Sequence, residues 1–111
     1  MNKEALLEQV KSINGVQGAI IISKDGLTIA NSMPPDIDPN LLSAVISSMF
    51  TNIDVQSKRM QRGSIKRFSL ETEKEVIVIT QFDMDGEALL LLGQFDSSVN
   101  LEEVVSKFKT I

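Results

Sequence analysis

The sequence predicts an α+β protein in which one five-stranded antiparallel sheet carries helices on both faces. The first observation is a pair of short runs, residues 19–22 and 76–79, which are rich in β-branched side chains and apolar on both faces. The second is the Asp-Gly pairs that begin at Asp25 and Asp85, where tight turns between strands are expected. The third is three segments with apolar residues at helical spacing. We expect residues 1–111 to form a single domain in the order helix, two strands, long helix, three strands, helix.

The chain begins with a predicted amphipathic helix over residues 2–12. A hairpin follows, with strands over residues 17–23 and 27–31. Asp25 and Gly26 tolerate the positive φ that a tight turn needs, so this segment is among the strongest kinds of hairpin signal. Because strand 17–23 is apolar on both faces, we expect it in the interior of the sheet, covered on both sides.

A long helix is predicted over residues 39–61, with Asp38 as its N-cap and Pro39 in its first turn. One broad apolar face is expected to lie on the sheet and comprises Leu42, Val45, Ile46, Met49, Ile53 and Met60. A second line of mostly small side chains runs beside it and comprises Leu41, Ala44, Ser48, Thr51 and Val55. Between residues 41 and 56 only Asp54 is charged, whereas a lone surface helix would more often carry lysine and glutamate there.

Gly63 ends the long helix, and the rest of the chain is predicted to complete the sheet. Three further strands are expected over residues 64–70, 76–82 and 88–95. A closing helix is expected over residues 100–109, with the Ser97-Ser98 pair as its cap.

The composition offers little material for catalysis. The chain has no cysteine, which excludes disulfides and a cysteine nucleophile, and no histidine, the usual general base and the commonest metal ligand. We therefore expect no enzyme activity, no metal and no cofactor. The net charge of −4 argues against non-specific nucleic-acid binding. No apolar run approaches the ~20 residues of a membrane span and no signal peptide is evident, so we expect a cytoplasmic protein without direct membrane insertion.

The order of the elements, together with several short motifs, resembles the Roadblock family. This is the dynein light-chain type of domain, which also occurs as small stand-alone proteins in bacteria and archaea. The matching residues are the helix that ends before Gly15-Val16, the strand Ala19-Ile20-Ile21-Ile22, the turn Asp25-Gly26-Leu27, the following Ile29-Ala30-Asn31, and Leu41-Leu42-Ser43-Ala44 at the start of the long helix. Their order and spacing extend over nearly the whole chain.

The resemblance implies a profilin-like α+β fold and a non-enzymatic domain that forms homodimers or heterodimers. In the family, the long helix and the strand after it pair across a two-fold axis and give one continuous sheet. The domain often serves as a platform or regulator for small Ras-like GTPases. By position, the two pairing elements are here residues 39–61 and 64–70.

The residues themselves also indicate a homodimer, with a solvated helix face as the alternative. Small side chains let two helices approach closely, and a face with little charge costs little to desolvate. A two-fold axis would set this face against its own copy. An edge strand over residues 64–70 would present unpaired backbone groups that a twin strand could satisfy. The predicted dimer and partner interface comprises Leu41, Ala44, Val45, Ser48, Thr51, Asn52, Val55, Arg59, Arg62, Ile65 and Arg67.

One basic cluster stands out in this acidic chain and comprises Lys58, Arg59, Arg62, Lys66 and Arg67. One explanation is compensation of the helix dipole together with solvation. Another is a docking patch for an acidic protein surface. Contact with phosphate or a membrane, and an arginine that Arg59 or Arg62 supplies to a GTPase active site, are further alternatives.

The leading hypothesis is a non-enzymatic, homodimeric scaffold or regulator that binds a small Ras-like GTPase through its paired long helices. The runner-up is a structural dimerisation subunit of a larger cytoskeletal, motor or membrane-associated assembly without a GTPase partner. A small-molecule sensor is the third hypothesis, and the near-continuous apolar strands disfavour it because they leave no polar pocket.

Overall fold

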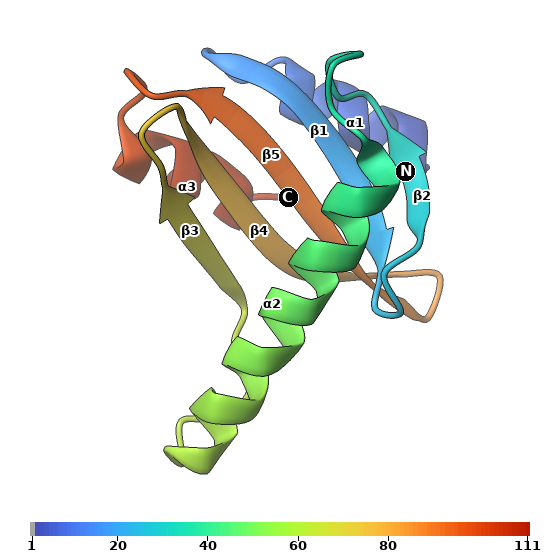
Figure 1. Cartoon of the computed structure of the whole chain (residues 1–111), viewed down its shortest axis with the longest axis vertical. Coiled ribbons are helices and arrows are strands. Elements are labelled where there is room, and N and C mark those ends of the chain that lie inside the picture. The colour runs from blue at the N-terminus through green and yellow to red at the C-terminus, as the bar shows by residue number, and fades with distance from the viewer. Residues whose placement is uncertain (1) are drawn as a thin grey trace.

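The computed structural model describes residues 2–111 and shows one antiparallel sheet with helices on both faces (Figure 1). The strands are β1 (Val16–Ser23), β2 (Thr28–Asn31), β3 (Arg67–Glu71), β4 (Glu75–Met84) and β5 (Glu87–Asp96). In space they follow the order β2-β1-β5-β4-β3, and every neighbouring pair is antiparallel. The predicted fold class and the predicted order of elements are therefore confirmed.

The three helices divide between the two faces of the sheet. The helices α1 (Lys3–Lys11) and α3 (Leu101–Lys109) cover one face, and the long helix α2 (Pro39–Arg59) crosses the other. Figure 1 shows α2 running diagonally over the sheet, so that its C-terminal turns extend past the sheet edge. The Asp38 carboxylate caps α2 as predicted, because Oδ1 accepts hydrogen bonds from the backbone N–H groups of Asn40 and Leu41.

Strand β1 is covered on both sides, as its sequence predicts. Ala19 and Ile21 point into the core beneath α1 and α3, whereas Ile20 and Ile22 point toward α2. All four side chains are fully buried. The alternation of a β-strand therefore supplies both cores from one apolar run.

The first hairpin turn does more than reverse the chain. Gly26 has φ of +89° and lies directly beneath α2, where a Cβ atom would come 3.4 Å from the Cα atom of Ala44. Glycine therefore provides both the left-handed backbone and the close approach of the helix. The second predicted tight turn has the same character, with positive φ at Asp85 and Gly86.

Three predicted boundaries differ from the structure. The long helix ends at Arg59 rather than at residue 61, because Gln61 adopts a positive φ of 61°. The strand predicted over residues 64–70 begins only at Arg67. The closing helix is capped by Asn100 and not by the Ser97-Ser98 pair, because Asn100 Oδ1 accepts a hydrogen bond from the N–H of Glu103.

Within residues 2–111 no helix is long and apolar enough to cross a membrane.

Candidate interaction surface

The sheet-facing side of α2 differs from the predicted apolar face. Ile46 is buried there as expected, and Phe50, which lies outside the predicted face, is buried as well. The other buried positions of the helix are serines. Val45, Ile53 and Met60 were expected to lie on the sheet, and this expectation is wrong, because they are 46%, 37% and 66% exposed. The residues that are buried in their place are Ser43, Ser47 and Ser57.

Hydrogen bonds from these serines explain why polar side chains occupy the inner face. Ser47 Oγ donates to the backbone carbonyl of Lys24 in the first hairpin, over 2.7 Å. The hydroxyls of Ser43 and Thr28 lie 2.7 Å apart, which ties the first turns of α2 to β2. Ser57 Oγ donates to the carbonyl of Gly63 over 2.8 Å. A buried hydroxyl is acceptable where it is hydrogen-bonded, so these contacts orient the helix.

The outer face of α2 is exposed and carries no charge over most of its length. Leu41, Val45 and Val55 are large apolar side chains that are 63%, 46% and 47% exposed. Small or polar side chains lie between them, namely Ala44, Ser48, Thr51 and Asn52, and all four are exposed. No residue from 39 to 53 is charged. We call these seven residues the outer face of α2.

Asp54 fixes the C-terminal turns of α2 to the segment that leads into β3. Its Oδ1 accepts a hydrogen bond from the backbone N–H of Ile65 over 2.9 Å, and its Oδ2 pairs with Lys58 Nζ at 3.0 Å. The hydrogen bond from Ile65 and the interaction with Lys58 together lower the pKa of Asp54 below its ordinary value of 3.8. This capture of the Ile65 amide explains why the strand begins later than predicted.

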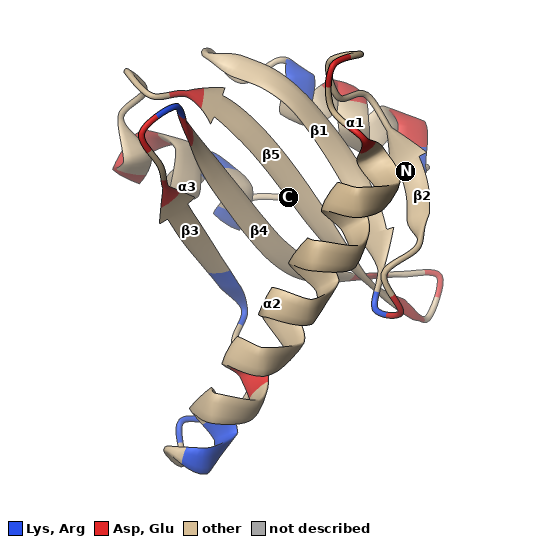
Figure 2. Cartoon of the chain, in the orientation of Figure 1, with Lys and Arg blue, Asp and Glu red and all other residues tan. Residues whose placement is uncertain are grey.

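The predicted basic cluster is divided by the structure. Figure 2 shows basic residues at the protruding end of α2, where Arg59 and Arg62 are exposed. Residues 54–67 carry five of the 11 Lys and Arg residues and one of the 15 Asp and Glu residues, so their net charge is +4 while the rest of the chain carries −8. Lys58 is paired with Asp54. Arg67 lies apart, because its side chain is on the other face of the sheet.

The two predicted interface residues near β3 occupy different layers. Ile65 is half-buried against the core beneath α2. Arg67 lies opposite Thr80 of β4, whereas the next residue, Phe68, lies opposite Ile79 and packs on the α2 side. Side chains alternate along a strand, so Arg67 faces the side that carries α1 and α3. The structure thus gathers most of the predicted interface on and around α2 but separates Arg67 from it.

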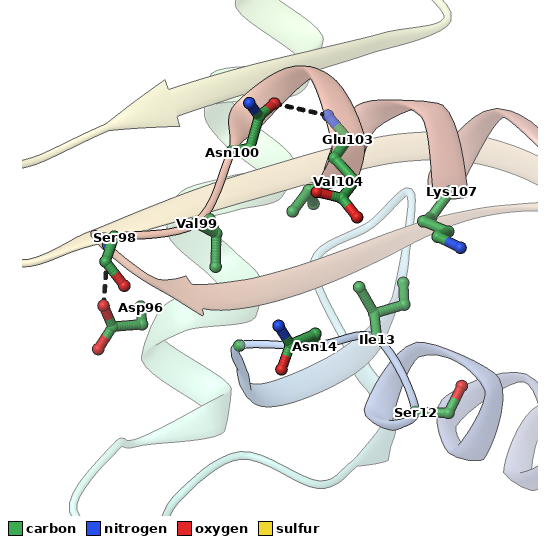
Figure 3. Close-up of a pocket in the computed structure, with 11 residues that line it drawn as sticks. Ser12, Ile13, Asn14, Asp96, Ser98, Val99, Asn100, Glu103, Val104 and Lys107 are labelled. Atoms are coloured by element: carbon green, nitrogen blue, oxygen red, sulfur yellow. Dashed lines mark hydrogen bonds between the residues drawn. The ribbon is translucent and has the colours of Figure 1, made fainter.

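A shallow groove of about 770 Å³ lies away from α2, between the end of α1 and the start of α3 (Figure 3). Its polar side chains mostly serve the local backbone. Asp96 Oδ1 accepts a hydrogen bond from the N–H of Ser98 over 2.8 Å, and hydrogen bonds from Ser98 lower the pKa of Asp96. Asn100 caps α3.

Nowhere in residues 2–111 do three His, Cys, Asp or Glu side chains gather closely enough to hold a metal ion.

Comparison with known proteins identifies the family. The profile of the Roadblock/LC7 domain matches residues 2–93, so the chain belongs to the Roadblock/LC7 domain family. An uncharacterised protein of Methanocaldococcus jannaschii, MJ0310, is 26% identical over 98 residues, which cover 88% of this chain and 82% of that protein.

Solved structures share the fold at low identity. Myxococcus xanthus MglB superposes with a TM-score of 0.83 at 17% identity, over 96% of this chain and 85% of that one. A Roadblock/LC7 domain from Streptomyces avermitilis gives a TM-score of 0.81 at 12% identity, over 99% of this chain and 91% of that one. The predicted Roadblock resemblance is therefore confirmed.

Sequence reasoning missed the polar inner stripe of α2. Ser43, Ser47, Asp54 and Ser57 are separated by four, seven and three residues, a spacing that places them on one side of a helix. This periodicity of small polar residues was available as a signal. A hydropathy pattern ignores it, because it assumes that the apolar side of a helix is the buried one.

Proposed function

We propose that this protein is a non-enzymatic, homodimeric scaffold or regulator in the cytoplasm, and that it binds a small Ras-like GTPase through its paired α2 helices. The observation that carries the proposal is the exposed, uncharged outer face of α2. Depletion of charge is typical of the buried centre of protein interfaces. On this proposal residues 1–111 constitute one Roadblock-like domain.

Self-association is supported by two neighbouring features. The outer face of α2 leaves Leu41, Val45 and Val55 in solvent, and β3 leaves an open edge of the sheet next to the C-terminal part of the same helix. A second copy related by a two-fold axis would cover both features at once, because each feature of one copy then faces the same feature of the other.

The GTPase partner follows from the family resemblance and from the distribution of charge. The family often serves small Ras-like GTPases, and in this chain Arg59 and Arg62 place exposed positive charge at the end of α2. A dimer would present a pre-formed, weakly charged surface with a basic flank at each end. Binding to such a surface would favour whichever nucleotide state of the GTPase fits it better.

The test mixes the purified protein with the Ras-like GTPases encoded in the same genome, loaded with GDP or with a non-hydrolysable GTP analogue. Titration calorimetry is expected to show tighter binding in one of the two states. The double variant Arg59→Glu/Arg62→Glu should weaken that binding and leave the dimer mass unchanged. The matched control is Lys107→Glu/Lys109→Glu, which reverses the same charge on α3, on the opposite face of the sheet. Absence of binding in both nucleotide states would contradict the GTPase proposal.

A structural subunit of a larger assembly is the second candidate, and one observation favours it. Leu27 and Ile29 are exposed apolar side chains at the β2 edge, which pairing through α2 and β3 would leave uncovered. Among the solved relatives, MglB has been seen with a tetrameric arrangement. On this proposal, sedimentation velocity would show species larger than a dimer at high concentration, and Leu27→Ser would remove them without affecting the dimer.

A further inference from the structure

The C-terminal end of α2 concentrates the positive charge of an otherwise acidic chain. We define the tip of α2 as residues 58–66, whose basic residues are Lys58, Arg59, Arg62 and Lys66. No Asp or Glu occurs from residue 55 to residue 70, and Asp54 pairs with Lys58. The three other cations of the tip are exposed, and within residues 2–111 they form no ion pair. The tip therefore presents positive charge that the chain itself does not neutralise.

The tip protrudes from the body of the molecule (Figure 1). Phe50 is the last apolar residue of α2 that is buried, and Arg59 follows it nine residues later, about 14 Å further along the helix. In Figure 2 the acidic segments lie mainly around the sheet and the other two helices. Electrostatic interactions in physiological salt decay over about 8 Å. The charge of −8 outside residues 54–67 therefore acts weakly at the tip, and it disfavours every other orientation on an anionic surface.

An apolar side chain lies among these cations. Met60 is 66% exposed, the highest value among the large apolar side chains of residues 2–111. It directly follows Arg59 and is the C-cap of α2. The chain then turns back sharply, with positive φ at Gln61 and Gly63. The end of the helix thus combines an exposed apolar side chain with basic residues on both sides of it in the sequence.

Two side chains of α2 hold this turn in place. Ser57 Oγ donates a hydrogen bond to the carbonyl of Gly63 over 2.8 Å. Asp54 Oδ1 accepts a hydrogen bond from the N–H of Ile65 over 2.9 Å. The tip is therefore an ordered turn that keeps its apolar and basic side chains together, and not a frayed helix end.

Basic side chains around an exposed apolar one match the chemistry of an anionic membrane surface. Lipid phosphates attract Lys and Arg, and the acyl chains beneath them accept an apolar side chain. We propose that the tip of α2 docks this protein on the surface of a membrane rich in anionic phospholipids. The cations Arg59, Arg62 and Lys66 contact the phosphates, and Met60 reaches the boundary of the acyl chains. The contact is peripheral, and no part of the chain crosses the bilayer.

The shape and the side chains of the tip favour a lipid surface over an acidic protein. The tip is convex, so a protein partner would need a cavity of matching shape, whereas a lipid surface deforms around it. Arg59 Nη1 donates a hydrogen bond to Gln56 Oε1 over 3.4 Å, which is long and holds the guanidinium weakly. Lipid phosphates are mobile and can follow such a side chain. The proposal requires neither a dimer nor a GTPase, and it leaves the outer face of α2 available for a protein partner.

Co-sedimentation with lipid vesicles tests the proposal in the absence of any GTPase. The wild type should bind vesicles of phosphatidylglycerol and phosphatidylcholine in equal amounts and should not bind phosphatidylcholine alone. About 1 M salt should release it, because the Debye length is then about 3 Å. Arg62→Glu/Lys66→Glu should weaken binding by roughly a hundredfold or more, because each basic residue near the surface contributes about fivefold. The matched control Lys107→Glu/Lys109→Glu makes the same charge change on α3 and should bind almost as well as the wild type.

Substitution of Met60 gives a second measurement that does not depend on charge. Met60→Ser removes the apolar contact and should weaken vesicle binding by roughly fivefold, whereas Met60→Leu should retain it. Leu27→Ser is the matched control, because Leu27 is 64% exposed and lies at the other edge of the sheet. This control should bind vesicles as the wild type does. Circular dichroism should show the wild-type spectrum for all these variants, since each substituted side chain is exposed.

The outcomes separate this proposal from the proposed function. Wild-type protein that does not bind anionic vesicles at low salt would overturn the proposal. Equal losses in Arg62→Glu/Lys66→Glu and Lys107→Glu/Lys109→Glu would assign the binding to net charge rather than to the tip, and would overturn it as well. Vesicle binding that survives Arg62→Glu/Lys66→Glu while GTPase binding is lost would assign the tip to a protein partner alone. Vesicle binding through the tip without binding to any GTPase would support the proposal and contradict the proposed function.

Discussion

The two faces of the sheet are covered in different ways by helices of very different length. The nine residues of α1 bury three apolar side chains, Leu6, Leu7 and Val10, whereas the 21 residues of α2 bury only two, Ile46 and Phe50. The remaining buried positions of α2 are serines, and its other large apolar side chains lie partly or mostly in solvent. A helix that contributes so little to the core of its own chain is available for contact with another one.

The largest expected effect on stability concerns the face under α1 and α3. Phe108 is 1% exposed and packs edge-on against Phe95, with ring centres 5.9 Å apart. Phe108→Ala should lower the free energy of unfolding by about 3–5 kcal/mol, because it leaves a cavity in a closed core. The measurement is a denaturant titration made in the Ser48→Glu variant. We expect that variant to be monomeric, so dimerisation does not contribute to its free energy of unfolding.

The matched change on the α2 side is Leu41→Ala, measured in the same background. It removes an exposed side chain and should cost less than about 1 kcal/mol. Equal losses from Phe108→Ala and Leu41→Ala would contradict the contrast between a closed face and an open one.

The second effect concerns association rather than stability. Ser48→Glu places a carboxylate at the centre of the outer face of α2, and burial of that charge without a partner should weaken dimerisation by about a hundredfold or more. Ala44→Glu should act in the same way. Light scattering is expected to show monomers that keep the wild-type circular dichroism spectrum.

Ser106→Glu is the control for that prediction, because it makes the same change at an exposed serine of α3. This variant should remain dimeric. A dimer that persists in Ser48→Glu, or that is lost equally in Ser106→Glu, would refute the outer face of α2 as the interface.

A smaller effect is expected from the polar contacts beneath α2. Ser47→Ala removes the hydroxyl that donates to the carbonyl of Lys24 and leaves that carbonyl with one bond fewer. The free energy of unfolding should fall by about 1–2 kcal/mol. Ser106→Ala, on the exposed side of α3, serves as its control and should change stability little. Equal stability of the two variants would show that the serine contacts do not hold the helix.

The smallest effect is a pH dependence at Asp54. Its pKa in the folded chain lies below the ordinary value of 3.8, so the unfolded chain binds more protons over that range and stability rises with pH there. The contribution is present above the ordinary value and is lost as the pH falls through the folded pKa. Asp54→Asn should be less stable than the wild type near about pH 7, and the difference should shrink toward about pH 2. A difference that grows on acidification would contradict this assignment.

The sequence predicts correctly those elements that depend only on residues close together in the chain. Asp-Gly turns, the N-cap at Asp38 and the doubly apolar strand 19–22 lie where local backbone preference and hydropathy agree. Strand order depends on contacts between residues far apart in sequence, and it was not predicted.

For the candidate interaction surface, the sequence predicts many of the exposed residues but not which side of α2 packs on the sheet. The sequence predicts a line of mostly small side chains beside the apolar face of the helix, and all five of its members are exposed, namely Leu41, Ala44, Ser48, Thr51 and Val55. A hydropathy pattern contains no information on hydrogen bonds, so it does not predict that Ser43 and Ser47 are buried by their contacts with Thr28 and Lys24. It therefore predicts, wrongly, that Val45, Ile53 and Met60 lie on the sheet. Strand β3 begins late for a similar reason, since the carboxylate of Asp54 holds the Ile65 amide outside the ladder.

We expect a second copy to cover the open side of this molecule in solution. Light scattering of the wild-type protein, measured over a wide range of concentrations, is the decisive experiment. We expect a mass of twice the 12.2 kDa of the chain, which falls toward the chain mass only on strong dilution. A mass of 12.2 kDa at every concentration would contradict it.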